Sequence, residues 1–527
     1  MRLFYLLSVL CATGFGLKIL VVNPTLGSSH VQFVSSIADT LAEAGHEVHM
    51  IVNTIDSRIT KYGAKKIAKL VVIPALEENV NNNNQFVKNP FKPSNMLSFA
   101  HMNNMTKSIV QACNDIVHYY DELLKPLENE HYDIGITQLL AVYPVMILHM
   151  LKVKTTVLAS ANPLAPYISQ TFGIPAPPSY TANPFGDVAQ LNAADFSYMD
   201  RVGNFFRDII YYTLIPMLMG RQREILATID PTIPVTYHDL MKDVSLILVN
   251  TPPMLEFATP ISHRVINIGG IAMKRDNKIN PDVLEIIDKA KKGVIVVSFG
   301  TLASTQNLDE KLITSFLSAF AQFPDYEFLF KFDASDEAKQ YEKLYPNVHL
   351  LKWLQQSAIL GHKKTKVFVS HMGLNSFMEA STHGVPFVSI PLFSDQFYNT
   401  ALAKSRGTAV YIDKMNITKS ALVEALQEVL TNTSYTANAR ILSRQLEKFP
   451  ENGTAKMIRM IEYVGEFGRL PNWDLKGIEL NWFVHASYDV IVPLILVTIL
   501  VFWIIYRLLK YIICYCCRKR SVKTKKE

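Results

Sequence analysis

Short apolar runs alternate with longer amphipathic segments along most of the chain. Lys18 to Asn23 is the first apolar run, and residues 28 to 44 follow it with helical spacing and two serines that can cap a helix start. Gly45 ends this segment, and residues 47 to 52 form the next apolar run. Such runs are typical of strands buried on both faces, so the order predicts a β-α-β unit in a parallel sheet.

The same alternation continues in two stretches, with residues 269 to 280 as the predicted linker between them. Further strands are predicted at residues 133–137, 155–159 and 246–249 in the first stretch, and at residues 293–298, 327–332, 349–351, 367–370 and 387–390 in the second. Alternating strands and helices predict two parallel α/β domains. Two such domains place a ligand cleft at the carboxyl ends of both sheets.

Two segments of the first half allow two interpretations. Residues 163–184 are rich in proline and aromatic residues, and residues 205–219 form a strongly apolar helix. They either line a pocket for an apolar ligand or pack between layers of the fold, and the sequence leaves both interpretations open. Residues 79–84 are rich in asparagine and predict a surface loop.

The first 16 residues have the pattern of a secretory signal peptide. Arg2 supplies the positive charge, residues 3–12 the apolar region, and Gly14 and Gly16 the small residues before a cleavage site. A buried first strand is the alternative. It fits poorly, because a much better strand begins at Lys18 immediately afterwards.

A second strongly apolar segment lies near the other end of the chain. Val490 to Tyr506 is free of charges and spans roughly 25 Å as a helix, close to the ~27 Å core of a thin bilayer. All faces of this segment are apolar, which argues against a core helix. Arg507 and Lys510 can snorkel, so we predict a membrane helix at residues 490–512.

The net charge of +6 comes from the C-terminal tail. Eight of the 52 lysines and arginines lie at or after Arg507 with one acid, Glu527, so the remaining residues carry 44 basic and 45 acidic groups. This distribution indicates a membrane surface as partner and no nucleic acid. The positive-inside rule places the tail in the cytosol and everything before the helix in the lumen. Lysines three and five places from the end match a retrieval signal, which predicts a type I protein of the endoplasmic reticulum membrane.

Cysteines and glycosylation sequons agree with a lumenal location. Cys113 is the only cysteine in the predicted lumenal part, so no disulfide is expected there. Sequons of the form N-x-[ST] begin at Asn104, Asn416, Asn432 and Asn452 and predict N-glycosylation.

The most informative segment runs from Trp353 to Gln396. It reads W-x-x-Q, then H-x-G-x-N-S-x-x-E, then P-x-x-x-D-Q. In length and residues it resembles the signature of the UDP-glycosyltransferase family, and the resemblance extends over nearly the whole chain, closest to the animal membrane-bound branch. It implies a GT-B fold, in which two Rossmann-like domains face each other across a cleft, plus one C-terminal transmembrane helix. It also implies a UDP-sugar as co-substrate, with no other cofactor and no metal.

The residue types of this segment suit a nucleotide sugar. Residues 371–376 turn from a strand into a helix whose N-terminal N–H groups and dipole can bind a diphosphate, and Gly373 lets the backbone approach it. Glu379 can accept both ribose hydroxyls, and Trp353 offers an aromatic face to uracil. The turn after the strand at 293–298 adds a second set of N–H groups. The predicted donor-binding residues are Ser298, Gly300, Thr301, Trp353, Gln356, His371, Gly373, Asn375, Ser376, Glu379, Asp395 and Gln396.

The family resemblance places a catalytic base at His30, just after the first strand. A neutral imidazole can take the proton of an acceptor hydroxyl as the oxygen attacks the anomeric carbon. The family carries a carboxylate on a later strand that orients this histidine, but the matching position here holds Gln138. Asp133 lies five residues earlier, roughly 16 Å along an extended strand, so we expect it to be too far away.

These patterns predict an inverting transferase that moves glucuronate or glucose from a UDP-sugar to a hydroxyl of a small lipophilic acceptor. Glucose is favoured because Val249 stands where glucuronosyl members usually carry an arginine. The alternative is a weak or inactive lumenal UDP-sugar-binding protein that partners active relatives in a homo- or hetero-oligomer. The predicted parts are the signal peptide at 1–16, an acceptor domain at 17–275, a UDP-sugar domain at 276–470, a juxtamembrane segment at 471–489, the membrane helix at 490–512 and a basic tail at 513–527.

Overall fold

The structure is a computed structural model, and it describes residues 16–76, 90–92, 99–186, 188–273, 278–301, 305, 308–333 and 335–523. These residues form two compact units. The first extends to Trp473 without Phe172–Ile174, which belong with Asp474 and the residues after it to the second. The predicted signal peptide up to residue 15, the asparagine-rich loop and most of the retrieval signal lie outside the described residues.

The first half of the chain builds a seven-stranded parallel sheet in the order β3-β2-β1-β4-β5-β6-β7. Side chains alternate between its two faces. Ile134 and Ile136 join the core that α2 covers, whereas Gly135 lies under Leu148 of α5 on the opposite face. The strands are β1 (Lys18–Val22), β2 (Glu47–Asn53), β3 (Lys69–Ile73), β4 (Ile134–Gln138), β5 (Thr155–Ser160), β6 (Val244–Val249) and β7 (Val265–Asn267), which confirms the strands predicted from apolar runs.

Helices connect these strands as the sequence pattern predicts. They are α2 (Ser28–Glu43), α4 (Phe99–Tyr119), α5 (Tyr143–Met150), α6 (Pro166–Thr171), α7 (Tyr198–Leu226) and α8 (Tyr237–Met241), with short π and 3-10 turns at η2 (Tyr120–Leu124), η3 (Lys125–Glu130), η4 (Val188–Asn192) and η5 (Pro253–Leu255). The predicted cap of the first helix is wrong. Gly27 is its N-cap residue, with φ of 140°, and no side chain caps the helix start. Its first N–H groups therefore face the loop after β1 without a serine over them.

A six-stranded parallel sheet follows in the order β10-β9-β8-β11-β12-β13. Its strands are β8 (Gly293–Ser298), β9 (Tyr326–Lys331), β10 (Val348–Leu351), β11 (Thr365–Ser370), β12 (Phe387–Ser389) and β13 (Ala409–Tyr411). The helices around it are α9 (Pro281–Lys289), α10 (Glu310–Phe320), α11 (Ser335–Leu344), α12 (Gln356–Leu360), α13 (Leu374–His383), α14 (Gln396–Ser405), α15 (Lys419–Thr431) and α16 (Thr433–Glu447), with a 3-10 turn at η7 (Lys414–Asn416). Packed phenylalanines fill one side of this sheet, with Phe320 stacked on Phe328 at 4.3 Å between ring centroids.

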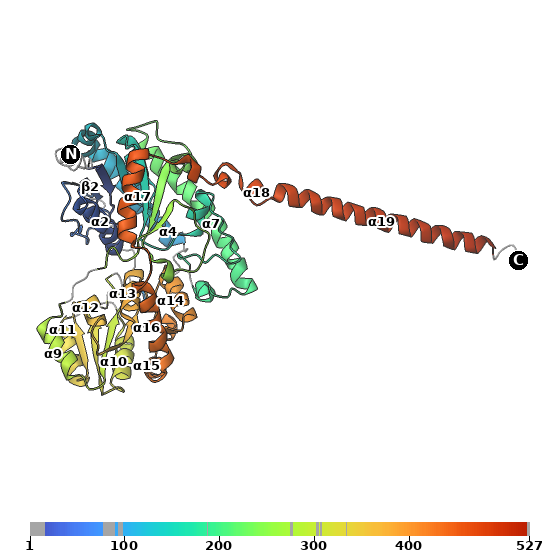
Figure 1. Ribbon diagram of the computed structural model, residues 1–527. Coiled ribbons are helices and arrows are strands. Elements are labelled where there is room, and N and C mark those ends of the chain that lie inside the picture. The colour runs from blue at the N-terminus through green and yellow to red at the C-terminus, as the bar shows by residue number, and fades with distance from the viewer. Residues whose placement is uncertain are drawn as a thin grey trace, which may run out of the picture. The chain divides into compact units, whose positions relative to one another are not determined.

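The last helix of the first unit, α17 (Gly453–Phe467), returns to the first sheet. Met457, Ile461 and Val464 are fully buried in the same core as the strands β1 and β4. Figure 1 shows α17 lying against the N-terminal strands, far along the sequence from them. The chain therefore crosses between its two halves twice, although the sequence assigned residues 276–470 to one domain. A 3-10 turn, η8 (Pro471–Trp473), ends the unit.

The second unit consists mainly of one long helix. It holds a 3-10 turn, η9 (Lys476–Glu479), a short helix, α18 (Trp482–His485), and α19 (Tyr488–Lys523). Within α19, Tyr488–Tyr515 has a mean hydropathy of 2.5 and is long and apolar enough to cross a membrane. No part of its most apolar window is buried within the protein. This finding agrees with the predicted C-terminal membrane helix and extends it at both ends.

Candidate functional site

A cleft with a cavity volume of about 380 Å³ lies at the carboxyl ends of strands from both sheets. Parallel strands present their carboxyl ends at one edge of the sheet, where loops can gather side chains that are distant in sequence. The lining includes His30 and all the predicted donor-binding residues, which are Ser298, Gly300, Thr301, Trp353, Gln356, His371, Gly373, Asn375, Ser376, Glu379, Asp395 and Gln396. The structure thus brings this predicted set together.

The two halves of the first unit touch inside this cleft. Asn250, just after β6, donates from Nδ2 to Oδ1 of Asn375 on α13 at 3.5 Å and to the Ala161 carbonyl at 3.3 Å. Asn250 is buried. A neutral amide contact therefore joins the halves beside the predicted diphosphate site.

The turn between β11 and α13 is held in a strained conformation. Met372 has a φ of 64°, in the left-handed region that residues with a Cβ seldom adopt. Ser370 Oγ accepts from the Met372 N–H at 3.0 Å, and Asn399 Nδ2 donates to the Met372 carbonyl at 2.9 Å. Gly373 is the N-cap of α13 and has no side chain to cap it, whereas the Asp395 carboxylate accepts from the Leu374 N–H at the helix start. The fixed turn leaves the N–H groups that follow Leu374 at the cleft, as an anion site requires.

His371 fills the space between two glycine turns. A Cβ at Gly300 would lie 2.7 Å from its Nε2, and a Cβ at Gly373 would lie 2.6 Å from the same atom. Gly300 also has a φ of 79°, so glycine suits this turn on both counts. The sequence explained Gly373 by the approach of a phosphate, and the structure adds that the imidazole itself excludes a side chain there. Burial lowers the pKa of His371 to about 4, so the ring is neutral near pH 7.

Three polar side chains of the signature segment are joined to one another. Gln356 Nε2, at the start of α12, donates to Ser376 Oγ at 3.1 Å and to Glu379 Oε2 at 2.6 Å. Ser376 and Glu379 lie one turn apart on α13. The contact fixes the carboxylate of Glu379 at the cleft wall.

Trp353 and Lys331 form one wall of the cleft. The Trp353 side chain is 60% exposed, so one face of the indole is accessible to a base. Lys331, the last residue of β9, places Nζ 5.8 Å from the indole centroid and donates to the Gly300 carbonyl at 2.5 Å. Sequence reasoning missed Lys331, because a polar residue at the end of an apolar strand carries no signal of its own.

The loop after β12 holds two predicted sugar-binding residues in different ways. Burial raises the pKa of Asp395 to about 6, although Asn399 Nδ2 donates to its Oδ2 at 3.0 Å. Gln396 Oε1 accepts from the N–H groups of Leu392 at 2.7 Å and Phe393 at 3.1 Å. The Gln396 carbonyl therefore supports its own loop, which leaves the amide NH₂ as the group that can reach a sugar.

His30 and Gln138 face each other beside the cleft. Gln138 is buried and donates from Nε2 to the Pro24 carbonyl at 2.8 Å, whereas its Oε1 has no hydrogen-bond partner among the described residues. Burial lowers the pKa of His30 to about 4, and the nearby Gln138 side chain opposes this effect. In the part of the chain that the structure describes, no carboxylate acts on this imidazole.

Asp133 is too far away to serve His30, as predicted. It lies before β4, whereas Gln138 ends that strand. Its carboxylate accepts from the Lys18 N–H at 3.0 Å and from Lys154 Nζ at 2.9 Å. These contacts hold Asp133 at the amino edge of the sheet, opposite the cleft.

A second, much smaller cavity of about 20 Å³ adjoins the first. Both cavities are lined by His30, Ala161 and Asn162. The remaining lining of the small cavity is mostly apolar and aromatic, and consists of Leu139, Leu140, Ser160, Tyr167, Ile168 and Phe185. Two of these residues come from the predicted segment 163–184, and Tyr167 stacks on Tyr211 of α7 with ring centroids 5.5 Å apart. The imidazole therefore stands in the wall between a polar cleft and an apolar pocket.

A model of one family, UDP-glucoronosyl and UDP-glucosyl transferase, matches residues 17–526. The chain belongs to the UDP-glycosyltransferase family. Its relatives include UDP-glucuronosyltransferase 3A1 of Bos taurus, which is 27% identical over 96% of this chain and 95% of that one. UDP-glucuronosyltransferase 2A3 of Cavia porcellus is 27% identical over 92% of each chain. The protein is accordingly a glycosyltransferase that uses a UDP-sugar donor.

Solved structures show the same fold. The calicheamicin glycosyltransferase CalG4 has a TM-score of 0.57 at 15% identity and covers 86% of this chain and 100% of its own. The glycosyltransferase of kitacinnamycin has a TM-score of 0.55 at 19% identity, with 86% and 99% covered. These likenesses confirm the predicted GT-B architecture. The apolar helix α19 fits single-pass membrane anchoring of this UDP-glycosyltransferase.

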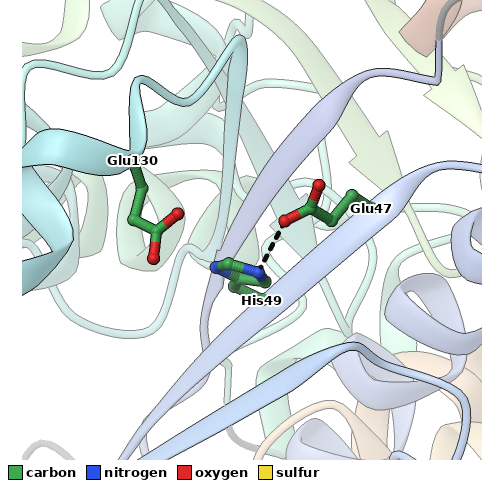
Figure 2. Close-up of side chains that lie close together, drawn as sticks. All are labelled: Glu47, His49 and Glu130. Atoms are coloured by element: carbon green, nitrogen blue, oxygen red, sulfur yellow. Dashed lines mark ion pairs between the residues drawn. The ribbon is translucent and has the colours of Figure 1, made fainter.

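The opposite edge of the first sheet carries a separate ionic cluster. Glu47, His49 and Glu130 offer ligand atoms that all lie within 4.8 Å of one another (Figure 2). His49 Nε2 contacts Glu47 at 3.0 Å, and its Nδ1 contacts the Tyr132 hydroxyl at 2.8 Å. Both ring nitrogens are therefore already engaged within this UDP-glycosyltransferase.

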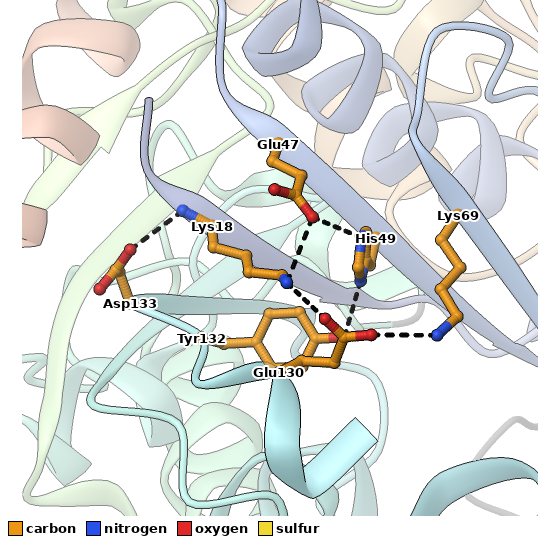
Figure 3. Close-up of polar contacts among 7 residues, drawn as sticks. All are labelled: Lys18, Glu47, His49, Lys69, Glu130, Tyr132 and Asp133. Atoms are coloured by element: carbon orange, nitrogen blue, oxygen red, sulfur yellow. Dashed lines mark hydrogen bonds and ion pairs between the residues drawn. The ribbon is translucent and has the colours of Figure 1, made fainter. Parts of the chain in front are cut away.

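Two lysines complete the cluster and argue against a cation there. Lys18 pairs with Glu130 and, at 3.2 Å, with Glu47, while Lys69 pairs with Glu130 at 3.2 Å (Figure 3). A metal ion would have to displace two ammonium groups from these carboxylates. We assign the cluster, which comprises Lys18, Glu47, His49, Lys69 and Glu130, to the stability of the strand starts and refer to it as the strand-start network.

Proposed function

We propose that this UDP-glycosyltransferase moves a hexose from its UDP-sugar to a hydroxyl of a small lipophilic acceptor, with His30 as general base. The observation that carries the proposal is the position of His30 in the wall shared by the polar cleft and the apolar pocket. A donor in the cleft and an acceptor in the pocket meet at this imidazole. A base must lie within hydrogen-bond reach of the proton that it removes, and this position provides it.

The proposed reaction is a single displacement. The acceptor oxygen attacks the anomeric carbon, the bond from that carbon to the β-phosphate oxygen breaks, and UDP departs. The hydroxyl proton passes to a ring nitrogen of His30, whose pKa the nearby Gln138 side chain raises against the effect of burial. One displacement inverts the configuration at the anomeric carbon. The N-terminus of α13 stabilises the charge that develops on the leaving diphosphate.

The donor arrangement follows from the edge of the second sheet. Trp353 follows β10, His371 follows β11, and Asp395 follows β12, so their order along the edge suits uracil, diphosphate and sugar in turn. In this proposal Glu379 binds the ribose hydroxyls, and Asp395 and the Gln396 amide bind the sugar. The apolar lining around Tyr167 then favours a lipophilic acceptor, and the small cavity, at about 20 Å³, has to open to admit one.

A neutral hexose is the donor sugar that we propose. Val249 ends β6 and is buried, so no arginine stands at that position to pair with a glucuronate carboxylate. Asp395 and Glu379 line the cleft and would repel a third negative charge. We expect UDP-glucose to bind more tightly than UDP-glucuronate to the purified full-length protein, measured by calorimetry in detergent. Tighter binding of UDP-glucuronate would reverse this assignment.

The test of the base is the His30→Ala variant. Turnover of a radiolabelled UDP-sugar onto a panel of phenols should fall by about 10²–10⁴-fold, the usual contribution of a general base, while UDP affinity changes little. His118→Ala, at an exposed position on α4, is the matched control and should retain full activity. If His30→Ala keeps most of the activity, the imidazole only supports the loop.

The competing proposal is a UDP-sugar-binding protein with little or no turnover. Gln138 is the observation that favours it, because an amide supplies no charge to an imidazolium. The same radiolabel assay separates the two proposals. Transfer by the wild type that disappears in His30→Ala supports the enzyme, and UDP binding without transfer to any phenol supports the binding protein.

A further inference from the structure

Lys331 occupies a central place on the edge that holds the donor residues. β9 lies between β10 and β8 in the sheet, so its last residue sits between Trp353 and the Gly300 turn. His371 lies directly against Gly300 on the other side. Lys331 therefore stands between the predicted base-binding and diphosphate-binding elements, although it lies outside the signature segment.

Two contacts hold the Lys331 side chain in the cleft lining. Its Nζ donates to the Gly300 carbonyl and lies over the Trp353 indole. Burial lowers the pKa of Lys331 from the ordinary lysine value, and the charge of Asp333 opposes this effect. The charge also reaches the diphosphate turn, because Lys331 lowers the pKa of His371. A partly desolvated ammonium interacts more strongly with an anion than an exposed one does.

The cleft lining contains more acidic than basic side chains, which makes the charge of Lys331 important for an anionic ligand. Among the described lining residues, Lys331 is the only lysine or arginine, and His30 and His371 are neutral near pH 7. The lining also contains the carboxyl groups of Glu379 and Asp395. A UDP moiety brings a negatively charged diphosphate into this site, and the dipole of α13 offers only about half an elementary charge at its N-terminus.

We propose that Lys331 binds the diphosphate of the donor and, through the same ammonium, holds the Trp353 ring in place for the uracil. The proposal rests on the donor site proposed above and adds a residue to it. When nucleotide is bound, the ammonium exchanges the Gly300 carbonyl for a phosphate oxygen, which is the stronger, charge-assisted partner. Because negative charge grows on the β-phosphate as the sugar departs, Lys331 also stabilises the leaving group.

Calorimetry on the purified full-length protein tests this with two probes, UDP and the uncharged nucleoside uridine. Lys331→Gln should weaken UDP binding by about 10- to 100-fold, the usual effect of losing a charge-assisted hydrogen bond, and uridine binding by much less. Lys331→Arg should restore most of the UDP affinity. Lys352→Gln, at an exposed position next to Trp353 and outside the cavity lining, is the matched control and should bind UDP normally.

The outcomes separate this proposal from the function on which it rests. If the wild-type protein fails to bind UDP, the proposed donor site is wrong, and the Lys331 proposal is wrong with it. Normal UDP binding by Lys331→Gln overturns the Lys331 proposal alone. An equal loss for UDP and uridine also overturns it, because support of Trp353 would then be the whole effect. A thermal melt of each variant identifies any loss that comes from unfolding.

Discussion

At the scale of single residues, the most consequential departure from the family pattern is Gln138, which stands where the family carries a carboxylate. Its Nε2 donates to the Pro24 carbonyl, and its side chain raises the pKa of His30, while its Oε1 has no hydrogen-bond partner among the described residues. The amide is neutral, so it supplies no counter-charge to a His30 imidazolium. Glutamate at this position would bring an oxygen against the Pro24 carbonyl, whereas the shorter aspartate would not reach that carbonyl. Aspartate is thus the better replacement.

We predict that Gln138→Asp raises turnover and moves the acidic limb of its pH profile to higher pH. A neighbouring carboxylate favours the imidazolium, so the pKa of His30 rises from about 4, and the base is lost at a higher pH than in the wild type. Loss of such a carboxylate costs about 10⁴ in turnover in a well-studied His–Asp pair. Rates at saturating donor from pH 4 to pH 8 measure both effects.

The wild type and Gln138→Glu serve as comparisons for that variant. Asp395, whose pKa is about 6, titrates in all three proteins, so its contribution cancels in the comparison. Glutamate should gain less than aspartate because one of its carboxylate oxygens would lie against the Pro24 carbonyl. Both variants could instead show the wild-type turnover and the wild-type acidic limb of the pH profile, with UDP affinity intact. That result would mean that another group already supplies the counter-charge to the His30 imidazolium.

Gly373 provides a second prediction at this scale. Gly373→Ala places a Cβ 2.6 Å from His371 Nε2, so the ring must move away from the start of α13. UDP affinity should fall by about tenfold or more, the effect of losing one hydrogen bond to a charged group. Gly203→Ala on α7 is the control, because a Cβ there meets nothing within 4 Å. Equal UDP affinity in both variants, measured by calorimetry, would contradict this account of Gly373.

The sequence predicted most residues of the site but not all of them. Trp353, His371 and Glu379 could be placed in one cleft because their spacing within one segment is specific. Lys331 could not, because its place in the cleft depends on β9 lying next to β8, and strand order is not readable from one apolar run. The two hydrogen bonds that Gln396 Oε1 accepts from its own loop could not be predicted either, since they depend on how the loop folds back on itself.

At the scale of elements, the strands were predictable and the helix starts were not. A run such as Ile19 to Val22 is apolar because helices cover both faces of the sheet, so the burial of the strand can be predicted from its sequence. The start of α2 follows a different requirement. Ser28 can cap a helix, yet the chain turns at Gly27 and leaves the helix start uncapped in the cleft lining. The preference of serine for the N-cap position is therefore overridden at this helix by the conformation of the loop in the cleft lining.

The strand-start network gives a prediction for the stability of the first sheet. Lys18 and Lys69 lower the pKa of Glu130 from its ordinary value of 4.5 to about 2. A carboxyl with a depressed pKa in the folded state stabilises it fully above pH 4.5, and this contribution disappears as the pH falls from 4.5 towards 2. Glu130→Gln should lower the free energy of unfolding by about 1 kcal/mol near pH 7, because the pairs are partly exposed.

Urea unfolding of wild type and Glu130→Gln at pH 7 and pH 4 measures this effect. The difference between the two proteins should shrink at the lower pH, since the carboxyl is then partly neutral in the unfolded chain. Glu122→Gln is a suitable control because Glu122 is exposed on the π turn η2, outside the network. A difference that grows at pH 4 would contradict the proposed ion pairing.

At the scale of the whole molecule, the position of the basic tail predicts a topology. Only the part after the apolar stretch of α19 should be cut when protease is added to sealed microsomes, because the positive-inside rule leaves that tail in the cytosol. Detergent added to the same microsomes should expose the first unit to digestion. The four sequon asparagines, Asn104, Asn416, Asn432 and Asn452, are exposed, so endoglycosidase sensitivity gives a second readout. Digestion of the first unit in sealed microsomes would reverse the proposed orientation.

The return of α17 to the first sheet has a consequence for how the protein is made. The core around β1 and β4 lacks Met457, Ile461 and Val464 until the ribosome has synthesised nearly the whole first unit. About 190 residues separate β7 from this helix, which corresponds to about 10–40 s at the usual rate of translation. For that interval the first half waits with part of its apolar core open, while the second half can close around its own sheet. In newly made chains the N-terminal half should therefore need chaperones for longer than the second half. The half that leaves the ribosome first would complete its core last.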